Sequence, residues 1–421
     1  MENLYLGIDF SDLGCSLSSF NPETRMVQVM PDENGEIWIP SFLSLNEESG
    51  QWKIGKEAQE DQGQPGCLVL KNLPSLLRSG KTLELNGECY TAEKLAGEFL
   101  NKLLWEAQKR SGTPELVSVA ICLENVSAAE AEKLSRICSE LELDLQKVHI
   151  INRQESFMYY LMSQKREIWS NVSYLFDYGE DGLFCYELDV LKGMRPVTAQ
   201  AHREKVQDAP PAAVTAEGGE FAEAADQWFC MLADRKLTGR IVSSVVLCGS
   251  GFSDLSWAKQ FIRRIYTQKS RKVYQVEAFY GMGAAFAAYH LAEEHRYFPY
   301  ICICEGRIST TISIFVEEKE TSEQLILIRE GTSCYEARAS IDLNLIEQKT
   351  LDLYVKNTGA PESYKLPLDL SSLMEDGRER TKVRLSIAFS KEDTMMVRVE
   401  DLGFGEIYPA TEQVILKSYH V

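Results

Sequence analysis

Two aspartates each end an apolar run of strand length and are followed at once by turn-forming residues. Asp9 closes the run 4–8, and Asp177 closes the run 172–176. An aspartate in this position can simply serve as a turn or cap residue. It can also present its carboxylate to a hydrated cation. Asp9 and Asp177 are therefore candidate ligands, and a structural turn role is the alternative.

Glycine pairs form the next candidate features. Gly249 and Gly251 flank Ser250 directly after the apolar run 245–248. Glycine permits a tight turn and close approach of a ligand to the backbone, so this segment is either a strand-to-helix turn or part of a binding site. Gly281 and Gly283 lie in an alanine-rich stretch of helical character, and we interpret them as positions of close helix packing.

Conventional hydrolase chemistry is not indicated. The five histidines are scattered, and none lies beside a plausible nucleophile in a recognisable turn. The eleven cysteines occur mostly singly inside apolar runs, which indicates buried reduced thiols. Cys302 and Cys304 have no histidine cluster beside them, so no zinc site is predicted.

The charge of the chain excludes several classes of partner. The 63 acidic residues outnumber the 44 lysines and arginines, giving a net charge of -19. Such a surface repels nucleic-acid phosphates and anionic lipid headgroups, so we expect neither nucleic acid nor membrane as a partner. The sequence has no signal-peptide pattern and no apolar run of about 18 residues, and a cytoplasmic location is expected.

Strand-like and helix-like segments alternate over the first part of the chain, which predicts an α/β fold. Thr91 is placed to cap a helix that ends before Gly112, and Ser127 with Glu130 forms a capping box before a second helix. A stretch rich in proline and alanine at 194–219 is interpreted as a mobile connector. A helix is expected at 278–294.

From Tyr297 onward the apolar period changes from helical spacing to strict alternation. Val383, Leu385, Ile387 and Phe389 alternate with polar residues before a turn. This pattern predicts a separate antiparallel β domain, a sandwich, over 296–421.

Several motifs occur in an order that resembles the seventy-kilodalton heat-shock chaperones. They are LGID at 6–9, DENGEIWIPS at 32–41, IGKEA at 54–58, the region 117–164, LFDYG at 175–179, VVLCGSG at 245–251 and GMGAA at 281–285. The resemblance implies an actin-like ATPase fold with lobe I over 1–170 and lobe II over 171–295, followed by a β-sandwich domain. The outer subdomain of lobe II is expected to be reduced, because the stretch between the second hairpin and residue 245 is short.

The resemblance also implies a nucleotide site and, with ATP or ADP, magnesium. Asp9 and Asp177 would hold the hydrated metal, and Lys71 would contact phosphate. The two phosphate hairpins and the adenosine turn would add Ser11, Asp12, Gly179, Gly249, Ser250 and Gly251.

The phosphate hairpins depart from the family pattern. The family's Asp-x-Gly-Thr-Thr is here Asp9-Phe10-Ser11-Asp12-Leu13, and its glycine-rich second hairpin is Asp177-Tyr178-Gly179-Glu180-Asp181-Gly182. Asp12, Glu180 and Asp181 are expected to flank the phosphates. One unit-charge repulsion at ~4 Å amounts to about 4 kcal/mol at an effective dielectric near 20. Uncompensated, it lowers affinity roughly a thousandfold.

The position of the family's catalytic glutamate is occupied by Arg153. An arginine neither positions an attacking water as a carboxylate does nor accepts a proton. We expect Arg153 instead to pair with Asp12 or Glu180, in an ion-pair cluster where a nucleotide would lie.

These departures lead to one leading hypothesis and two alternatives. The leading hypothesis is a chaperone-like pseudo-ATPase that acts as a scaffold for a protein or peptide partner. The alternatives are a divergent magnesium-dependent ATPase chaperone and a sensor that binds nucleotide without hydrolysing it.

Overall fold

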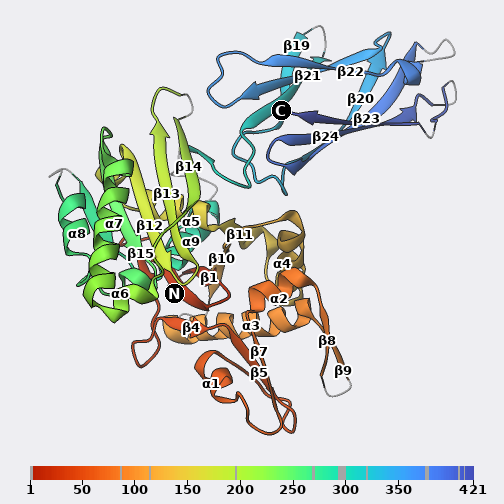
Figure 1. Cartoon of the computed structure of the whole chain (residues 1–421). Helices are drawn as coiled ribbons and strands as arrows, with labels where there is room; N and C mark the ends of the chain where they lie inside the picture. Colours follow the sequence, from red (N-terminus) through yellow and green to blue (C-terminus); the bar gives the residue numbers. More distant parts are fainter. Residues whose placement is uncertain are drawn as a thin grey trace. The chain divides into compact units, whose positions relative to one another are not determined.

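The computed structural model has a mixed α/β architecture that divides into two compact units (Figure 1). One unit comprises Met1–Lys192 and Ala199–Tyr300, and the other comprises Gly193–Thr198 and Ile301–Val421. The domain boundary expected at 295–296, the start of the β pattern at Tyr297 and the last two residues of the helix expected at 278–294 lie outside the described residues. The described residues are 3–85, 88–112, 115–194, 197–267, 271–292, 300–318, 321–374, 379–405, 408–411 and 413–421.

The first six-stranded sheet of the larger unit is built around β1 (Leu4–Phe10). β1 runs parallel to β10 (Leu116–Leu123) and antiparallel to β2 (Gly14–Asn21). The order along the sheet is β11-β10-β1-β2-β3, and β4 also pairs with β2. The other strands are β11 (Val148–Asn152), β3 (Met26–Val29) and β4 (Trp38–Pro40).

Two strands of different sheets follow each other closely at 38–46. β4 ends at Pro40, and β5 (Phe42–Asn46) begins a separate three-stranded sheet. Proline has no amide hydrogen to donate to a neighbouring strand, which accounts for the break. The smaller elements of this region are β6 (Trp52–Ile54), α1 (Gly55–Glu60), β7 (Cys67–Lys71), α2 (Leu73–Ser79), β8 (Thr82–Leu85) and β9 (Glu88–Thr91).

The alternation of side chains along β1 gives the sheet two covered faces. On one face Phe10 stacks on Phe99 of α3 (Ala92–Ser111), with ring centroids 5.9 Å apart. On the other face Tyr5 packs edge-on against Tyr289 of α9 (Phe279–Ala292). The predicted cap at Thr91 and the predicted capping box at Ser127, which opens α4 (Ala128–Glu140), are both confirmed.

The second six-stranded sheet has the order β16-β15-β12-β13-β14-β17. Its aromatic residues on β12 pack against α7 (Gly219–Leu237) and α8 (Lys259–Ile265), which cover one face (Figure 1). Phe229 of α7 and Phe261 of α8 contact each other, with ring centroids 5.2 Å apart. The strands are β12 (Val172–Gly179), β13 (Gly182–Leu191), β14 (Val197–Val206), β15 (Val242–Cys248), β16 (Lys272–Gln275) and β17 (Tyr300–Ile303), and α5 spans Arg153–Ser163.

The interpretation of 194–219 as a connector is wrong. Residues Val197–Val206 form β14 inside the second sheet, and Ala213–Glu217 form α6. The strand buries small residues such as Ala199 and Ala201 and carries four charged or imidazole side chains in a row, so its intrinsic strand preference is weak. Pairing within the sheet, and not local propensity, determines its conformation. Pro196 lies outside the described residues.

Helix α9 lies directly on β1, and the close packing predicted for Gly281 and Gly283 is confirmed. A Cβ atom added at Gly7 would lie 2.2 Å from the backbone nitrogen of Ala285 and from the carbonyl oxygen of Gly281. A Cβ atom at Gly283 would lie 2.1 Å from the carbonyl oxygen of Ser156 on α5. The packing of α9 therefore depends on the absence of side chains at these positions.

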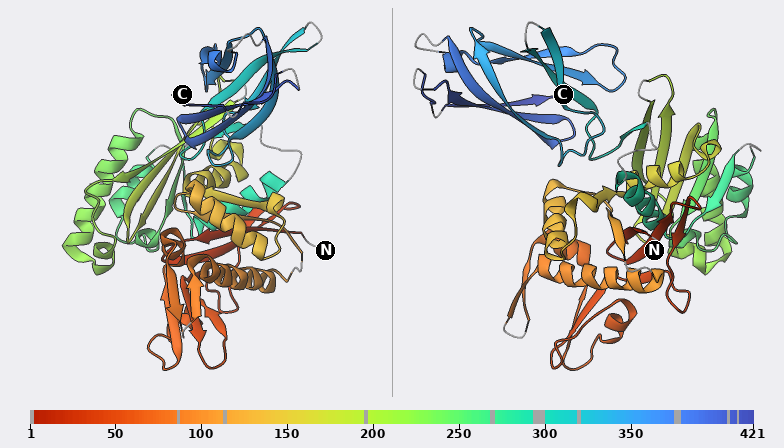
Figure 2. Two further views of the ribbon diagram at one scale, coloured as in Figure 1. Left: turned by 90° about the vertical axis from the view of Figure 1, so that its right-hand side faces the viewer. Right: turned by 180° about the vertical axis from the view of Figure 1, so that it is seen from behind.

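The smaller unit consists of two four-stranded antiparallel sheets, ordered β19-β18-β21-β22 and β20-β23-β24-β25. The two sheets face each other across one hydrophobic cluster, in which Ile312 and Val355 from one sheet join Leu385 and Val399 from the other (Figure 2). The alternation predicted at 383–389 is confirmed by β23. The strands are β18 (Thr310–Glu318), β19 (Thr321–Ile328), β20 (Arg338–Ile346), β21 (Thr350–Asn357), β22 (Tyr364–Asp369), β23 (Arg380–Lys391), β24 (Thr394–Gly403) and β25 (Val414–His420).

Within the described residues, no helix combines the length and the apolar character that crossing a bilayer requires.

The contact between β1 and α9 gives a direct test by substitution. Gly7→Ala is expected to lower the free energy of unfolding by about 3 kcal/mol or more, because rigid backbone on α9 must move away. Gly97→Ala is the matched control: it lies in α3, and its new Cβ would meet Ile137 Cγ2 at an ordinary 3.5 Å. Removing a helical glycine there should raise stability by up to about 1 kcal/mol. Urea unfolding followed by circular dichroism measures both, and equal stabilities for the two variants would contradict the packing described.

Candidate functional site

Asp9 and Asp177 lie at the carboxyl-terminal ends of two strands, and both line the same cavity of about 520 Å³. Each strand runs parallel to a neighbour, β1 to β10 and β12 to β15. The carboxyl ends of parallel strands are the usual position of ligand sites in α/β sheets. Nine residues were named from the sequence for a nucleotide site, and six of them line this cavity: Asp9, Ser11, Asp177, Gly179, Gly249 and Ser250.

Asp12, Lys71 and Gly251 do not line this cavity. Asp12 accepts hydrogen bonds from the backbone nitrogen of Ser75, at 2.9 Å, and from its hydroxyl, at 2.5 Å, in the first turn of α2. Lys71 is exposed at the end of β7. The carboxylate of Asp12, which was expected to flank the phosphates, is held by the first turn of α2.

Gly249 and Gly251 pack against β12 for different reasons. Gly249 has a φ of 92°, and a Cβ atom there would lie 2.4 Å from the carbonyl oxygen of Tyr178 and 2.8 Å from Oδ1 of Asp177. A Cβ atom at Gly251 would lie 2.3 Å from the Tyr178 ring. The segment forms the predicted turn after β15, here into a short 3-10 helix (Ser250–Phe252). Gly249 and Ser250 also line the cavity.

Asp9 is the most deeply buried acid of the cavity, with 2% of its surface exposed. Its Oδ1 atom has no hydrogen-bond partner among the described residues. Burial raises the pKa of Asp9 to about 6; Arg153 lowers it in part, and Asp177 raises it further. The neighbouring thiols of Cys15 and Cys122 are held neutral, because burial and the Asp9 charge raise their pKa values.

Arg153 occupies the space between the two sheets at this end. One of its terminal nitrogens lies 3.8 Å from Oδ2 of Asp177, and its guanidinium lies 4.6 Å from the centroid of the Tyr280 ring. The Tyr280 hydroxyl donates to the same Asp177 oxygen at 2.6 Å. Arg153, Asp177 and Tyr280 thus form one buried cluster, which we call the Arg153 cluster.

The partner predicted for Arg153 was wrong, although the prediction of an internal ion pair was correct. Arg153 pairs with Asp177, and not with Asp12 or Glu180. The hydroxyl and amide of Ser75 already hold Asp12, and Glu180 is exposed in the turn between β12 and β13. Burial alone would lower the pKa of Arg153, but Tyr280, Asp9 and Asp177 together raise it, so the guanidinium keeps its charge.

The start of α5 fixes the position of Arg153. Asn152 caps this helix by accepting from the backbone nitrogen of Glu155 at 2.9 Å, and the Glu155 carboxylate accepts from the backbone nitrogen of Asn152 at 3.0 Å. This capping box makes Arg153 the first residue of the helix, immediately after β11. The sequence carries the motif, an asparagine followed three positions later by a glutamate.

Several cavity residues were not predicted from the sequence. Tyr280 is the most important, and its only signal was its position directly before Gly281, where close helix packing was predicted. Leu13 and Trp38 also line the cavity with 61% and 44% of their surfaces exposed. The remaining unpredicted lining residues include Phe252, Val276, Glu277 and Phe279.

The charges of the cavity do not fit a nucleoside triphosphate. Its described lining contains five carboxylates, from Asp9, Asp177, Glu180, Asp181 and Glu277, and its cationic side chain, Arg153, is already paired. A magnesium ion could use two carboxylates and water, but Arg153 competes for Asp177. Among the described residues, no group of three or more His, Cys, Asp or Glu side chains is arranged to hold a metal.

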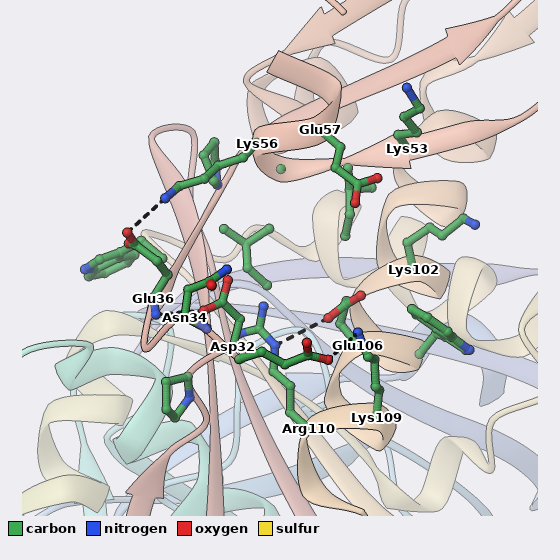
Figure 3. Close-up of a pocket in the computed structure, with 18 of the residues that line it drawn as sticks. Asp32, Asn34, Glu36, Lys53, Lys56, Glu57, Lys102, Glu106, Lys109 and Arg110 are labelled. Atoms are coloured by element: carbon green, nitrogen blue, oxygen red, sulfur yellow. Dashed lines mark hydrogen bonds and ion pairs between the residues drawn. The ribbon is translucent and has the colours of Figure 1, made fainter. Parts of the chain in front are cut away.

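A second cavity, of about 720 Å³, lies between α3, α1 and the loop before β4 (Figure 3). Its charged side chains pair with one another: Lys56 of α1 with Glu36 at 3.0 Å, Lys109 of α3 with Glu33 at 3.2 Å, and Arg110 with Glu106 at 3.4 Å within α3. Trp38 borders both cavities. The charges of this second cavity largely neutralise one another, so it is a weaker candidate than the cavity at Asp9.

The chain belongs to the family described as "Family of unknown function (DUF5716) C-terminal", which matches residues 23–305, more than half of the chain. Residues 307–421 match a second description, "Domain of unknown function (DUF8552)". The larger match lies within the larger unit, apart from residues 193–198 and 301–305.

The chain is also similar to heat-shock proteins over a short segment. It is 34% identical to Heat shock 70 kDa protein 13 of Rattus norvegicus and of Homo sapiens over 94 residues, and 32% identical to that of Mus musculus over 110 residues. These segments cover 22% to 26% of this chain and only 18% to 21% of the relatives. The similarity supports a distant heat-shock 70 kDa-like relationship.

The burial of Asp9 predicts how stability depends on pH. Below about pH 3 Asp9 is protonated in both the folded and the unfolded chain and contributes no difference. As the pH rises toward 6, the unfolded chain ionises while the folded chain keeps the proton, so the free energy of unfolding falls. Above pH 7 the burial of Asp9 has lowered the free energy of unfolding by about 3 kcal/mol. The stability advantage of Asp9→Asn over the wild type should therefore be about 2 to 3 kcal/mol larger at pH 8 than at pH 4, as urea unfolding at both pH values measures.

Removing Arg153 should destabilise the protein, whereas Asp9→Asn should stabilise it. Arg153→Met leaves Asp9 and Asp177 without their buried counter-charge and is expected to destabilise the protein by about 3 kcal/mol at pH 8. The loss should be smaller in an Asp9→Asn background, where one buried charge fewer remains. A double-mutant cycle of unfolding free energies measures this coupling. Strictly additive effects would show that Arg153 does not compensate Asp9.

Proposed function

We propose that this chain is a chaperone-like pseudo-ATPase: an actin-like two-lobed fold, with a reduced outer subdomain of lobe II, that acts as a cytoplasmic scaffold for another protein. The two six-stranded sheets would be the cores of the lobes, with the Asp9 cavity as the degenerate nucleotide cleft. The reduced subdomain is supported by the short segment between β14 and β15, which holds α6 and α7. The paired sheets of the smaller unit would be the β-sandwich domain.

The observation that carries the proposal is the Arg153 cluster. In a working ATPase of this type, one carboxylate positions the attacking water and others hold the metal. Here the first of these positions carries a guanidinium, which binds the carboxylate of Asp177 instead. Tyr280 occupies a further lone pair of the same oxygen. The exposed carboxylates of Glu180 and Asp181 add repulsion for any phosphate that approaches.

Binding of a protein partner is supported by the surface of the smaller unit. Phe315 and Ile326 are 45% and 38% exposed on the neighbouring strands β18 and β19. The ring centroids of Phe315 and of Tyr354 on β21 lie 4.7 Å apart. This contact extends the apolar surface across a third strand. Exposed aromatic groups of this kind are enriched at protein interfaces.

One observation favours the alternatives, a divergent magnesium-dependent ATPase or a nucleotide sensor. Asp9 and Asp177, the two positions that hold the metal in the heat-shock chaperones, line one cavity, and Asp9 keeps an unpartnered oxygen. A hydrated metal could satisfy that oxygen if Arg153 moved away.

Isothermal titration calorimetry with ATP and ADP, with and without magnesium, separates these functions. The wild type is expected to give no saturable heat at millimolar nucleotide, because the carboxylates repel phosphate and Arg153 is paired. The same titrations on Asp177→Ala, with Glu60→Ala on the exposed surface of α1 as the control, identify the site of any binding. Saturable magnesium-dependent binding that is lost in Asp177→Ala and kept in Glu60→Ala would overturn the pseudo-ATPase.

A further inference from the structure

The Asp9 cavity has an apolar side that a lost phosphate site does not explain. Leu13 and Trp38 are both large and strongly exposed where they line it, and Phe252, Val276 and Phe279 lie in its wall. Leu13 replaces a hydroxyl residue of the phosphate hairpin with an aliphatic one. An exposed aromatic ring and an aliphatic side chain that line one cavity favour contact with a flat apolar group.

The charged side of the cavity favours a cation. Five carboxylates face one arginine, so the described lining carries a formal excess of four negative charges when all of them are ionised. An anion entering this space would be repelled, and a cation would be attracted, more strongly than in water because the walls are apolar. Arg153 balances part of this charge, through its ion pair with Asp177 and its attraction to Asp9.

A second, independent observation marks the point at which the cation would bind. Asp9 lines the cavity with only 2% of its surface exposed, and its Oδ1 atom is itself buried and has no hydrogen-bond partner among the described residues. A buried acceptor without a donor is strongly unfavourable, and a ligand that supplies the donor gains that free energy. Neither neighbour supplies it: the Tyr280 hydroxyl donates to Asp177, and Nε of Arg153 is itself without a hydrogen-bond partner among the described residues.

We propose that this cavity binds a small organic cation with a flat apolar body, whose ammonium group donates a hydrogen bond to Asp9 and whose body packs between Leu13 and Trp38. This inference rests on the proposed loss of triphosphate binding and assigns a ligand class to the same cavity. A hydrated metal ion would use the carboxylates but leave the apolar wall without a function. The volume of about 520 Å³ is within the range of small-molecule sites.

The shared chemistry, an ammonium group on an apolar stem, can come from a free amine or from a lysine side chain of a partner protein. The flat wall formed by Trp38 favours the free aromatic amine, because a lysine offers only a flexible aliphatic stem. Tryptamine is therefore the first probe, and Nα-acetyl-lysine amide is the second.

Calorimetric titration at pH 8 compares three ligands of nearly the same shape: tryptamine, the uncharged alcohol tryptophol and the anion indole-3-propionate. Tryptamine is expected to bind saturably and about tenfold or more tightly than tryptophol, because only the amine carries the charge and the full set of donors. Indole-3-propionate should not bind. Equal affinities for the three ligands, or no binding of tryptamine, would overturn the proposal without any variant being made.

Two kinds of variant then locate the ligand. Asp9→Asn should weaken tryptamine about tenfold and leave tryptophol unchanged, whereas Trp38→Ser should weaken both. Glu60→Gln, which removes a charge from the exposed surface of α1, is the matched control and should change neither. A tryptamine affinity that survives Asp9→Asn in a folded protein would contradict the assignment.

The same instrument separates failure of this inference from failure of the proposed function. Magnesium-dependent ATP binding that tryptamine does not displace would overturn the pseudo-ATPase and the inference together. Absence of both ATP and tryptamine binding would overturn only the inference. Tighter binding of Nα-acetyl-lysine amide than of tryptamine would overturn the assignment to a free aromatic amine and identify a partner's lysine as the source.

Discussion

The site depends on a backbone-to-backbone contact that tolerates no side chain. Helix α9 approaches β1 so closely that a single methyl group at Gly7 would overlap the backbone at Ala285 and Gly281. The residue before Gly281 is Tyr280, whose hydroxyl reaches Asp177 on the second sheet. The backbone carbonyl of Tyr280 also accepts a hydrogen bond from Ser156 of α5 at 2.7 Å. One short stretch of α9 therefore contacts the first sheet and α5 with its backbone, and the second sheet with its aromatic side chain.

The electrostatics of the cavity follow from this arrangement. Asp9 and Asp177 end strands of different sheets, and the close packing of α9 and α5 places them in one buried space. Two buried carboxylates in a low-dielectric space repel each other and lose hydration, which is unfavourable unless a cation is present. In this protein Arg153, held at the first position of α5 by its capping box, is that cation. The protein's own side chain has the electrostatic role that a bound cation has in a carboxylate site.

Local signals in the sequence predicted the elements well and the site only in part. The caps at Thr91 and Ser127, the helix-packing glycines and the strand ends at Asp9 and Asp177 are short-range features, and the structure contains each of them. Choices among long-range partners were not predictable. Arg153 had several acids within plausible reach, and only the folded chain shows that Ser75 holds Asp12 and that Glu180 is exposed.

Two further features, β14 and Tyr280, were not predicted for the same reason. The strand β14 was taken for a connector because its small and charged residues carry little intrinsic preference, and its conformation comes from strands distant in sequence. Tyr280 was not selected from the sequence, because nothing local indicates that its hydroxyl lies 2.6 Å from a carboxylate 103 positions earlier.

The Arg153 cluster also bears on evolutionary reversibility, if the chain descends from an active ATPase as proposed. Replacing Arg153 by glutamate in one step would place a third carboxylate beside Asp9 and Asp177 with no cation between them. That intermediate would be destabilised before any phosphate-binding group had been regained, and a marginally stable protein tolerates few such steps. Recovery of ATPase activity would require the arginine, the acids of the second hairpin and Leu13 to change together. Under the proposed function, the ion pair would therefore make loss of the ATPase activity much easier than its return, because the return needs several changes at once.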